Sequence, residues 1–223
     1  LFPLSYYLWL RQFDGNHRFV WLMLSVPVLF AYIVPGLGTN WLKLWEFNTR
    51  LRLGKFRPHH GFVFGTATSL LALLCVASPP ADFSLIEFIR AGFILGSVLA
   101  FWNWLYDMYA IKAGFLVVYN KAYAQKLGPG AIAADYAPVL FGIFGVCYGL
   151  TIRFSQYYLL ELGRWDYYGF LLIGGNLAGL TIPVLAFMLH SYLKYGETGL
   201  KRYANHPQPA PPKTYRRFWS NTN

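Results

Sequence analysis

Three histidines near the ends of apolar segments are the residues of this 223-residue chain best suited to hold a cofactor. His59 and His60 stand side by side before an apolar run, and His190 lies near the end of the last one. Imidazole ligates haem iron and transition metals, and one imidazole also suits the magnesium of a chlorophyll-type pigment. Because neighbouring helical residues point about 100° apart, only one of His59 and His60 can face a given site.

Asp107 adds a carboxylate at a similar depth, in the last turns of an apolar segment and one turn after Asn103. An ionisable group at membrane depth is a functional candidate. We therefore treat Asp107 as a possible metal ligand together with His59, His60 and His190. The alternative is that these side chains reach lipid headgroups or form ion pairs.

The usual signatures of catalysis are missing from the sequence. It contains no HExxH, GxSxG, P-loop or CxxC motif. Cys75 and Cys147 both fall inside apolar segments, so neither a disulfide framework nor a cysteine metal site is indicated. Catalytic residues therefore stay unassigned.

The composition is that of a membrane protein. Hydrophobic residues make up 56% of the chain and charged residues 13%, whereas soluble domains carry about 25% charged residues. The net charge of +10 comes from cations in the short connections between apolar segments. In that position they set membrane topology, so we do not expect nucleic acid as a partner.

An all-α, polytopic transmembrane bundle with about five spans is the predicted fold. A span needs ~17–25 apolar residues. Lysine and arginine are in excess in the first and third connections and in the C-terminal region, which places these on the cytoplasmic or equivalent face. If a helix precedes Leu1, the count becomes six. The expected spans are 19–38, 61–78, 91–110, 137–153 and 167–193.

Two regions outside the spans have their own predicted character. In the first connection, Trp41, Leu44, Trp45 and Leu51 approximate a helical stripe, which predicts a short interfacial basic helix. Residues 1–193 form one transmembrane domain in this interpretation. Residues 194–223 form a basic, proline-rich cytoplasmic tail.

Glycine pairs at four-residue spacing occur in four of the five spans. Small residues let helix backbones approach closely in lipid, so the pairs predict tight helix packing without identifying the neighbour. Among polar residues in the spans, Asn176 predicts an interhelical hydrogen bond, and Arg153 is expected to snorkel to the interface. The pairs are Gly61 with Gly65, Gly92 with Gly96, Gly145 with Gly149, and Gly175 with Gly179.

The apolar span centres and packing glycines favour an accessory or structural subunit of a larger membrane complex. Such a subunit would contact membrane lipids, other membrane protein subunits, and pigments or quinone, in a bacterial or organellar inner membrane. A membrane redox or lipid-modifying enzyme, with a histidine and aspartate site at the cytoplasmic face, is the alternative. A small transporter is the third hypothesis, although the spans show no polar path.

Overall fold

The computed structural model describes residues 1–48 and 58–203, and for residues 58–60 only the backbone. Helices dominate, which confirms the predicted all-α bundle. The α-helices are α1 (Phe2–Gln12), α2 (His17–Gly36), α3 (Pro58–Val76), α4 (Leu85–Lys112), α5 (Lys121–Ala124), α6 (Pro129–Ala134), α7 (Ala137–Ser155) and α8 (Tyr168–Tyr195). Two π-helical segments, η1 (Leu37–Trp41) and η2 (Gln156–Glu161), and the 3₁₀ turn η3 (Trp165–Tyr167) adjoin them.

Four helical segments of the described chain are long and apolar enough to cross a membrane. They cover His17–Trp41, Leu85–Lys112, Pro129–Glu161 and Trp165–Tyr195. The remaining expected span, 61–78, corresponds to α3, whose apolar part, Gly61–Val76, is shorter than the other four segments. The protein is therefore membrane-embedded, with four clear spans and one shorter apolar helix.

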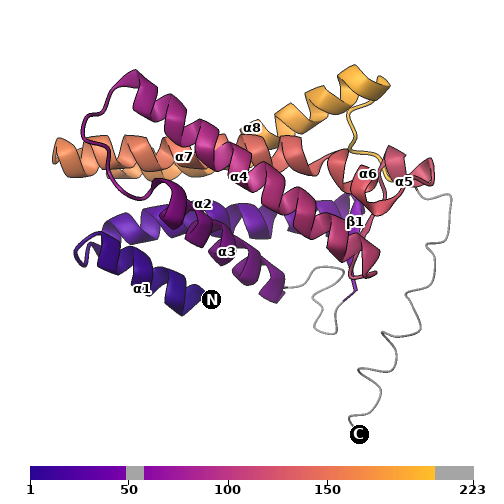
Figure 1. Ribbon diagram of the computed structural model, residues 1–223, viewed down its shortest axis with the longest axis horizontal. Helices are drawn as coiled ribbons and strands as arrows, with labels where there is room; N and C mark the ends of the chain where they lie inside the picture. Colours follow the sequence, from indigo (N-terminus) through magenta and orange to yellow (C-terminus); the bar gives the residue numbers. More distant parts are fainter. Residues whose placement is uncertain (49–57, 204–223) are drawn as a thin grey trace, which may run out of the picture.

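The helices form one bundle in which α7 lies between α4 and α8, while α2 packs against α3 and α8 (Figure 1). Helix α1 folds back along α2 and α3. Its Trp9 indole donates to the Ser69 carbonyl at 3.1 Å, and its Ser5 hydroxyl lies 2.5 Å from the Ser69 hydroxyl. These polar contacts fix α1 against α3 in a region where lipid supplies no hydrogen-bond partner.

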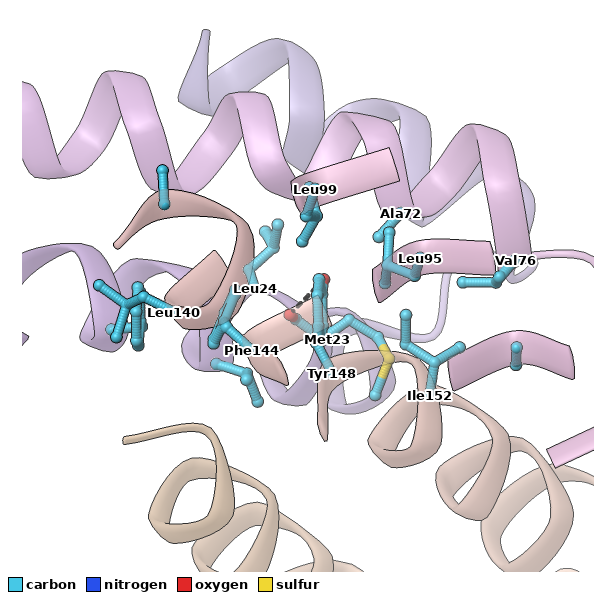
Figure 2. Packing of buried hydrophobic residues seen from close by; sticks show 14 of the residues in the cluster. Met23, Leu24, Ala72, Val76, Leu95, Leu99, Leu140, Phe144, Tyr148 and Ile152 are labelled. Atoms are coloured by element: carbon cyan, nitrogen blue, oxygen red, sulfur yellow. Dashed lines mark hydrogen bonds between the residues drawn. The ribbon is translucent and has the colours of Figure 1, made fainter. Parts of the chain in front are cut away.

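The core between α2, α4 and α7 is mainly apolar, and the buried side chain of Tyr148 lies within it (Figure 2). Pro27 lies inside α2 and has no N–H, so the carbonyl of Met23, one turn earlier, loses its helical partner. The Tyr148 hydroxyl of α7 donates to that carbonyl at 2.8 Å. A neighbouring helix thus satisfies the carbonyl that the proline leaves free, as membrane helices require.

Glycines let α4 and α7 meet backbone to backbone. A methyl group on Gly145 would lie 2.6 Å from the Leu95 carbonyl oxygen, and one on Gly149 would lie 2.6 Å from that of Ala91. On α4, a methyl group on Gly96 would meet the Gly142 carbonyl oxygen at 2.9 Å. We call this antiparallel contact the α4–α7 seam. Any side chain on Gly145 or Gly149 would force the two helices apart.

The other glycine pairs also face helices of the same chain. Gly65 of α3 lies against the backbone of α2, and Gly61 lies against the Tyr32 ring of α2. On α8, Gly175 contacts Thr151 of α7, and Gly179 faces side chains of both α2 and α7. In this chain the paired glycines thus lie at intramolecular helix contacts.

In its described part, up to residue 48, the first connection does not form the helix predicted for it. Residues Trp45–Phe47 are instead strand β1, which pairs antiparallel with strand β2 (Leu116–Val118) of the third connection. Trp45 lies opposite Val118, and the Tyr119 amide extends the ladder to the Leu44 carbonyl at 2.7 Å. The helical stripe was the wrong interpretation because a strand from the third connection satisfies this backbone. Leu51 lies outside the described residues.

Arg153 does not snorkel to the interface. Its side chain is only 4% exposed and donates from Nη1 to the Ser78 carbonyl at 2.8 Å and to Gln156 Oε1 at 2.5 Å. Gln156 in turn donates to the Ala77 carbonyl at 2.6 Å. The arginine therefore ties the end of α7 to carbonyls that follow α3, which is a structural use of a buried charge. The interhelical hydrogen bond predicted for Asn176 is confirmed, with Ser25 of α2 at 2.9 Å.

Candidate functional site

One end of the bundle gathers the three cation-rich regions of the sequence (Figure 1). Strands β1 and β2 bring the first and third connections together, and residues 196–203, which follow α8, lie against them. The Tyr203 amide donates to the Tyr119 carbonyl at 2.9 Å, and the Arg202 guanidinium lies 4.0 Å from the centre of the Tyr119 ring. We call this the basic end, and residues 196–203 the strap.

A pocket of about 430 Å³ lies beside the β1–β2 ribbon at the basic end. Its walls come from α2 and η1 (Ile33, Val34, Leu37, Gly38), from α8 (Leu180, Thr181, Val184, Leu185, Phe187), from the ribbon (Leu44, Trp45, Val118), and from Leu42, Tyr119, Asn120, Tyr136, Leu140, Gly199 and Leu200. This volume is within the range of about 300–1,000 Å³ that ligand sites occupy.

The few polar side chains around this pocket already have hydrogen-bond partners. Asn120 accepts from the Tyr123 amide at 3.0 Å and donates to the Ile132 carbonyl at 2.9 Å. Thr181 donates to the Leu177 carbonyl at 2.7 Å, and Tyr119 donates to Glu46 at 3.3 Å. The remaining lining side chains are apolar or aromatic, so the walls favour a hydrocarbon ligand.

Asp107 is buried beside this pocket and is bound by a single hydrogen bond. It is 5% exposed, and Oδ2 accepts a hydrogen bond of 2.5 Å from the Tyr136 hydroxyl. Tyr136 comes just before α7, and its ring stacks with Trp45 of β1, with 6.5 Å between ring centres. The pair therefore joins the end of α4, the start of α7 and the β1–β2 ribbon.

A second, smaller cavity of about 40 Å³ lies against Asp107 and Tyr136. Its other walls are apolar or aromatic: Phe30, Ala31, Val34, Pro35, Trp45, Phe47, Phe64, Leu116, Leu140 and Phe141. Val34, Trp45, Tyr136 and Leu140 line both this cavity and the large pocket. The two spaces are thus neighbours that share a wall, and the carboxyl of Asp107 stands on the side of the smaller one.

Of the three histidines predicted to converge with Asp107, only His190 has a described side chain, so the convergence stays a prediction. His190 lies on α8, and α7 packs between α8 and α4, which carries Asp107. The side chains of His59 and His60 lie outside the described residues, although their backbone begins α3. Within residues 1–48 and 61–203, no cluster of three histidine, cysteine or acidic side chains is arranged to hold a metal ion.

The strap is held by hydrogen bonds that shift two pKa values. The Tyr203 hydroxyl donates to the Glu197 carboxylate, which lowers the pKa of Glu197 from its usual value of 4.5. Burial, reinforced by that carboxylate, raises the pKa of Tyr203 to about 12. Nearby, the buried Asp135 accepts from Lys194 at 2.7 Å and from Tyr195 at 2.5 Å, which anchors the end of α8 on the residues before α7.

Sequence reasoning identified Asp107 but missed the residues that make its surroundings. Tyr136 is one of 17 tyrosines, and nothing in its local sequence marks it as a partner of a carboxyl 29 positions away. Trp45 was expected on an interfacial helix, not on a strand over the cavity. No model of a protein family matches this sequence, and no curated protein or solved structure matches it either.

Proposed function

We propose that this protein is a non-catalytic membrane subunit that holds one long hydrocarbon chain, from a lipid or a lipid-like cofactor, in the large pocket at the basic end. The apolar pocket of about 430 Å³ is the observation that carries the proposal. A soluble protein would fill or wet such a space, whereas a bilayer offers acyl and isoprenoid chains directly at its mouth.

The mouth of the pocket lies on the surface that faces lipid. Ile33, Leu37 and Leu185 line the pocket, and they are 40%, 46% and 60% exposed. They belong to α2 with its η1 extension and to α8, two membrane-spanning segments, so a chain can enter sideways from the bilayer. The described residues that line the pocket include no charged side chain, so none of them has to be dehydrated when the chain enters.

The basic end gives this ligand a defined place in the membrane. Its cations favour the cytoplasmic or equivalent leaflet, where anionic lipids attract them, in a bacterial or organellar inner membrane. The bound chain would then start near this interface and extend toward the membrane centre. Membership of a larger complex is part of the proposal, supported by the apolar outer face of α8 with Phe170, Ile173, Leu177, Leu189 and Leu193 exposed.

An enzyme acting on a membrane lipid is the second candidate, and the Asp107–Tyr136 pair favours it. A carboxyl and a phenol in hydrogen-bond contact beside a ligand pocket are groups that can exchange protons with a substrate. Asp107→Asn should then abolish turnover of the lipid that co-purifies with the protein, while the amount of bound lipid stays unchanged.

Native mass spectrometry of the protein released from mild detergent tests the proposal. We expect the wild-type protein to retain one lipid-like molecule. Val184→Trp, which adds bulk inside the pocket, should reduce that occupancy at least fivefold, whereas Leu177→Trp on the exposed face of α8 should not. Equal retention by both variants, or an empty wild-type protein, would contradict the proposal.

The same sample shows whether the ligand is a pigment. A visible absorption spectrum with a band that shifts on reduction would indicate haem, and red or near-infrared bands would indicate a chlorophyll-type pigment. A featureless spectrum together with a retained mass identifies a colourless lipid or quinone. Proteins that co-purify in the mildest extracting detergent test the membership of a complex, and a chain that always runs alone contradicts it.

A further inference from the structure

We infer that Asp107, oriented by the Tyr136 hydroxyl, binds the head of the lipid, and that this head is a small uncharged hydroxyl group. The inference rests on the proposed function, because it assumes that a hydrocarbon chain occupies the large pocket. It goes beyond that function by naming the class of lipid, a long-chain or isoprenoid alcohol, and the side chains that select it.

The first argument is an unused acceptor. Within the described part of the chain, Asp107 accepts one hydrogen bond, at Oδ2 from Tyr136, and Oδ1 accepts none. Asp107 is 5% exposed and lines the small cavity. A carboxyl oxygen that opens only onto a small, largely apolar cavity is costly unless a donor occupies that cavity, so we expect a donor there. A ligand hydroxyl meets this need.

The second argument is size. The small cavity has a volume of about 40 Å³, about a tenth of that of the large pocket, and a cavity with ~10–15 Å³ of space for the centre of a water molecule already holds one. A hydroxyl group with its carbon fits this space. A phosphocholine, a phosphoglycerol or a sugar does not, so the common membrane lipids can place a chain in the large pocket without filling the small cavity.

The third argument is charge. The described residues that line the small cavity include no lysine, arginine or histidine, so an anionic head would face the Asp107 carboxyl without a counter-ion. An ammonium head would be attracted by the carboxyl, but taking a second charge out of water costs about as much free energy as the buried ion pair returns, and its three N–H donors exceed the acceptors that the side chains of this cavity offer, on Asp107 and Tyr136. A hydroxyl has one donor, which matches the single open acceptor.

The fourth argument is continuity. Val34, Trp45, Tyr136 and Leu140 line both spaces, so the small cavity adjoins the large pocket and only these four side chains separate Asp107 from a chain bound there. The Trp45 ring stacks on Tyr136 and lies over Gly38, where a methyl group would come within 2.4 Å of the indole. This contact fixes the indole at the boundary between the two spaces.

Binding of three matched probes to the full-length protein in lipid nanodiscs tests the inference. The probes are hexadecan-1-ol, hexadecane and hexadecylamine, with occupancy measured by native mass spectrometry over a concentration series. We expect the wild-type protein to bind hexadecan-1-ol about tenfold more tightly than hexadecane, which corresponds to ~1.4 kcal/mol. We expect hexadecylamine, which is charged at neutral pH, to bind no better than hexadecane.

Two variants and a control assign this preference to the site. Asp107→Leu should lose the preference for the alcohol and still bind hexadecane, which also shows that it folds. Tyr136→Phe should keep the preference, since it frees Asp107 Oδ2 to accept from the ligand. Asp82→Leu removes an exposed carboxylate just before the start of α4, at the opposite end of this helix from Asp107, and should behave like the wild-type protein.

The outcomes separate this inference from the proposed function. Equal binding of alcohol and alkane by the wild-type protein would overturn the inference and leave the proposed function standing. Failure of all three probes to bind would overturn both. A preference that survives in Asp107→Leu, or the tightest binding by hexadecylamine, would overturn the assignment of an uncharged head to Asp107.

Discussion

Helix α7 has two sides that show opposite ways of packing helices in a membrane. Toward α4, glycines bring the backbones so close that a methyl group on Gly145 would lie 2.6 Å from the Leu95 carbonyl oxygen. Beyond its other side, α2 and α8, together with the β1–β2 ribbon, line a pocket of about 430 Å³ at the basic end. The same bundle thus contains a seam without free space and a region with room for a ligand.

The difference lies in what fills the space between the helix axes. At the α4–α7 seam, glycine removes the side chain, so dispersion contacts between backbones hold the helices together. Around the pocket, large side chains such as Trp45 and Phe187 form the wall, and the paired strands β1 and β2 form one side of it. We infer that the seam carries stability and the pocket carries function, and this contrast can be tested.

The largest expected effect on stability is at the α4–α7 seam. Gly145→Val should destabilise the protein by ~1–3 kcal/mol or more, because the added side chain meets backbone atoms that cannot rotate away. Unfolding by sodium dodecyl sulfate in mixed micelles of dodecylmaltoside measures the change. As a control, Gly174→Val on α8, where no atom lies within 4 Å of the added methyl group, should stay within ~0.5 kcal/mol. Equal losses of unfolding free energy in the two variants would show that the α4–α7 seam is no more sensitive to added side chains than the exposed face of α8.

A smaller effect is expected where α7 meets α2. Tyr148→Phe removes the donor to the Met23 carbonyl that Pro27 leaves free, and should cost ~1 kcal/mol in the same assay. In a Pro27→Ala background, the helix can supply its own amide to Met23, so the cost of Tyr148→Phe should fall. If Tyr148→Phe lowers the free energy of unfolding equally in that background, the hydroxyl does not compensate for the amide that Pro27 lacks.

The smallest effect is expected at the strap, whose Gly199 and Leu200 line the pocket. Because the pKa of Glu197 is lowered in the folded protein, its contribution is present above its usual pKa of 4.5 and is lost as pH falls through the lowered value. Because the pKa of Tyr203 is raised to about 12, its contribution is present below 10.0 and is lost as pH rises toward 12. The strap should therefore open at both low and high pH.

Hydrogen exchange of the Tyr203 amide, corrected for the intrinsic effect of pH, measures this opening. Protection should be constant between about pH 5 and 9 and fall below pH 4.5, with no parallel loss at amides of the α4–α7 seam. Glu197→Gln should remove the acidic change, since its side chain does not titrate. An acidic loss of protection that persists in Glu197→Gln would assign the effect to another group.

The sequence by itself determined the membrane character, the helices and the positions of close packing. Long apolar segments and glycines at four-residue spacing are local patterns, and the physics of a helix in lipid converts them directly into structure. The grouping of the first connection, the third connection and the residues after α8 was also expected, because charge bias in the connections reports which of them share a face.

Only the tertiary structure decided the site. The pairing of Trp45–Phe47 with Leu116–Val118, the hydrogen bond from Tyr136 to Asp107, and the pocket between α2 and α8 all join residues distant in the sequence. Arg153 shows the same limit, since its burial depends on carbonyls some 75 positions earlier. Periodicity reports how one segment faces its surroundings, but the identity of the neighbour is set by contacts among all the helices at once, and those contacts leave no mark in local sequence.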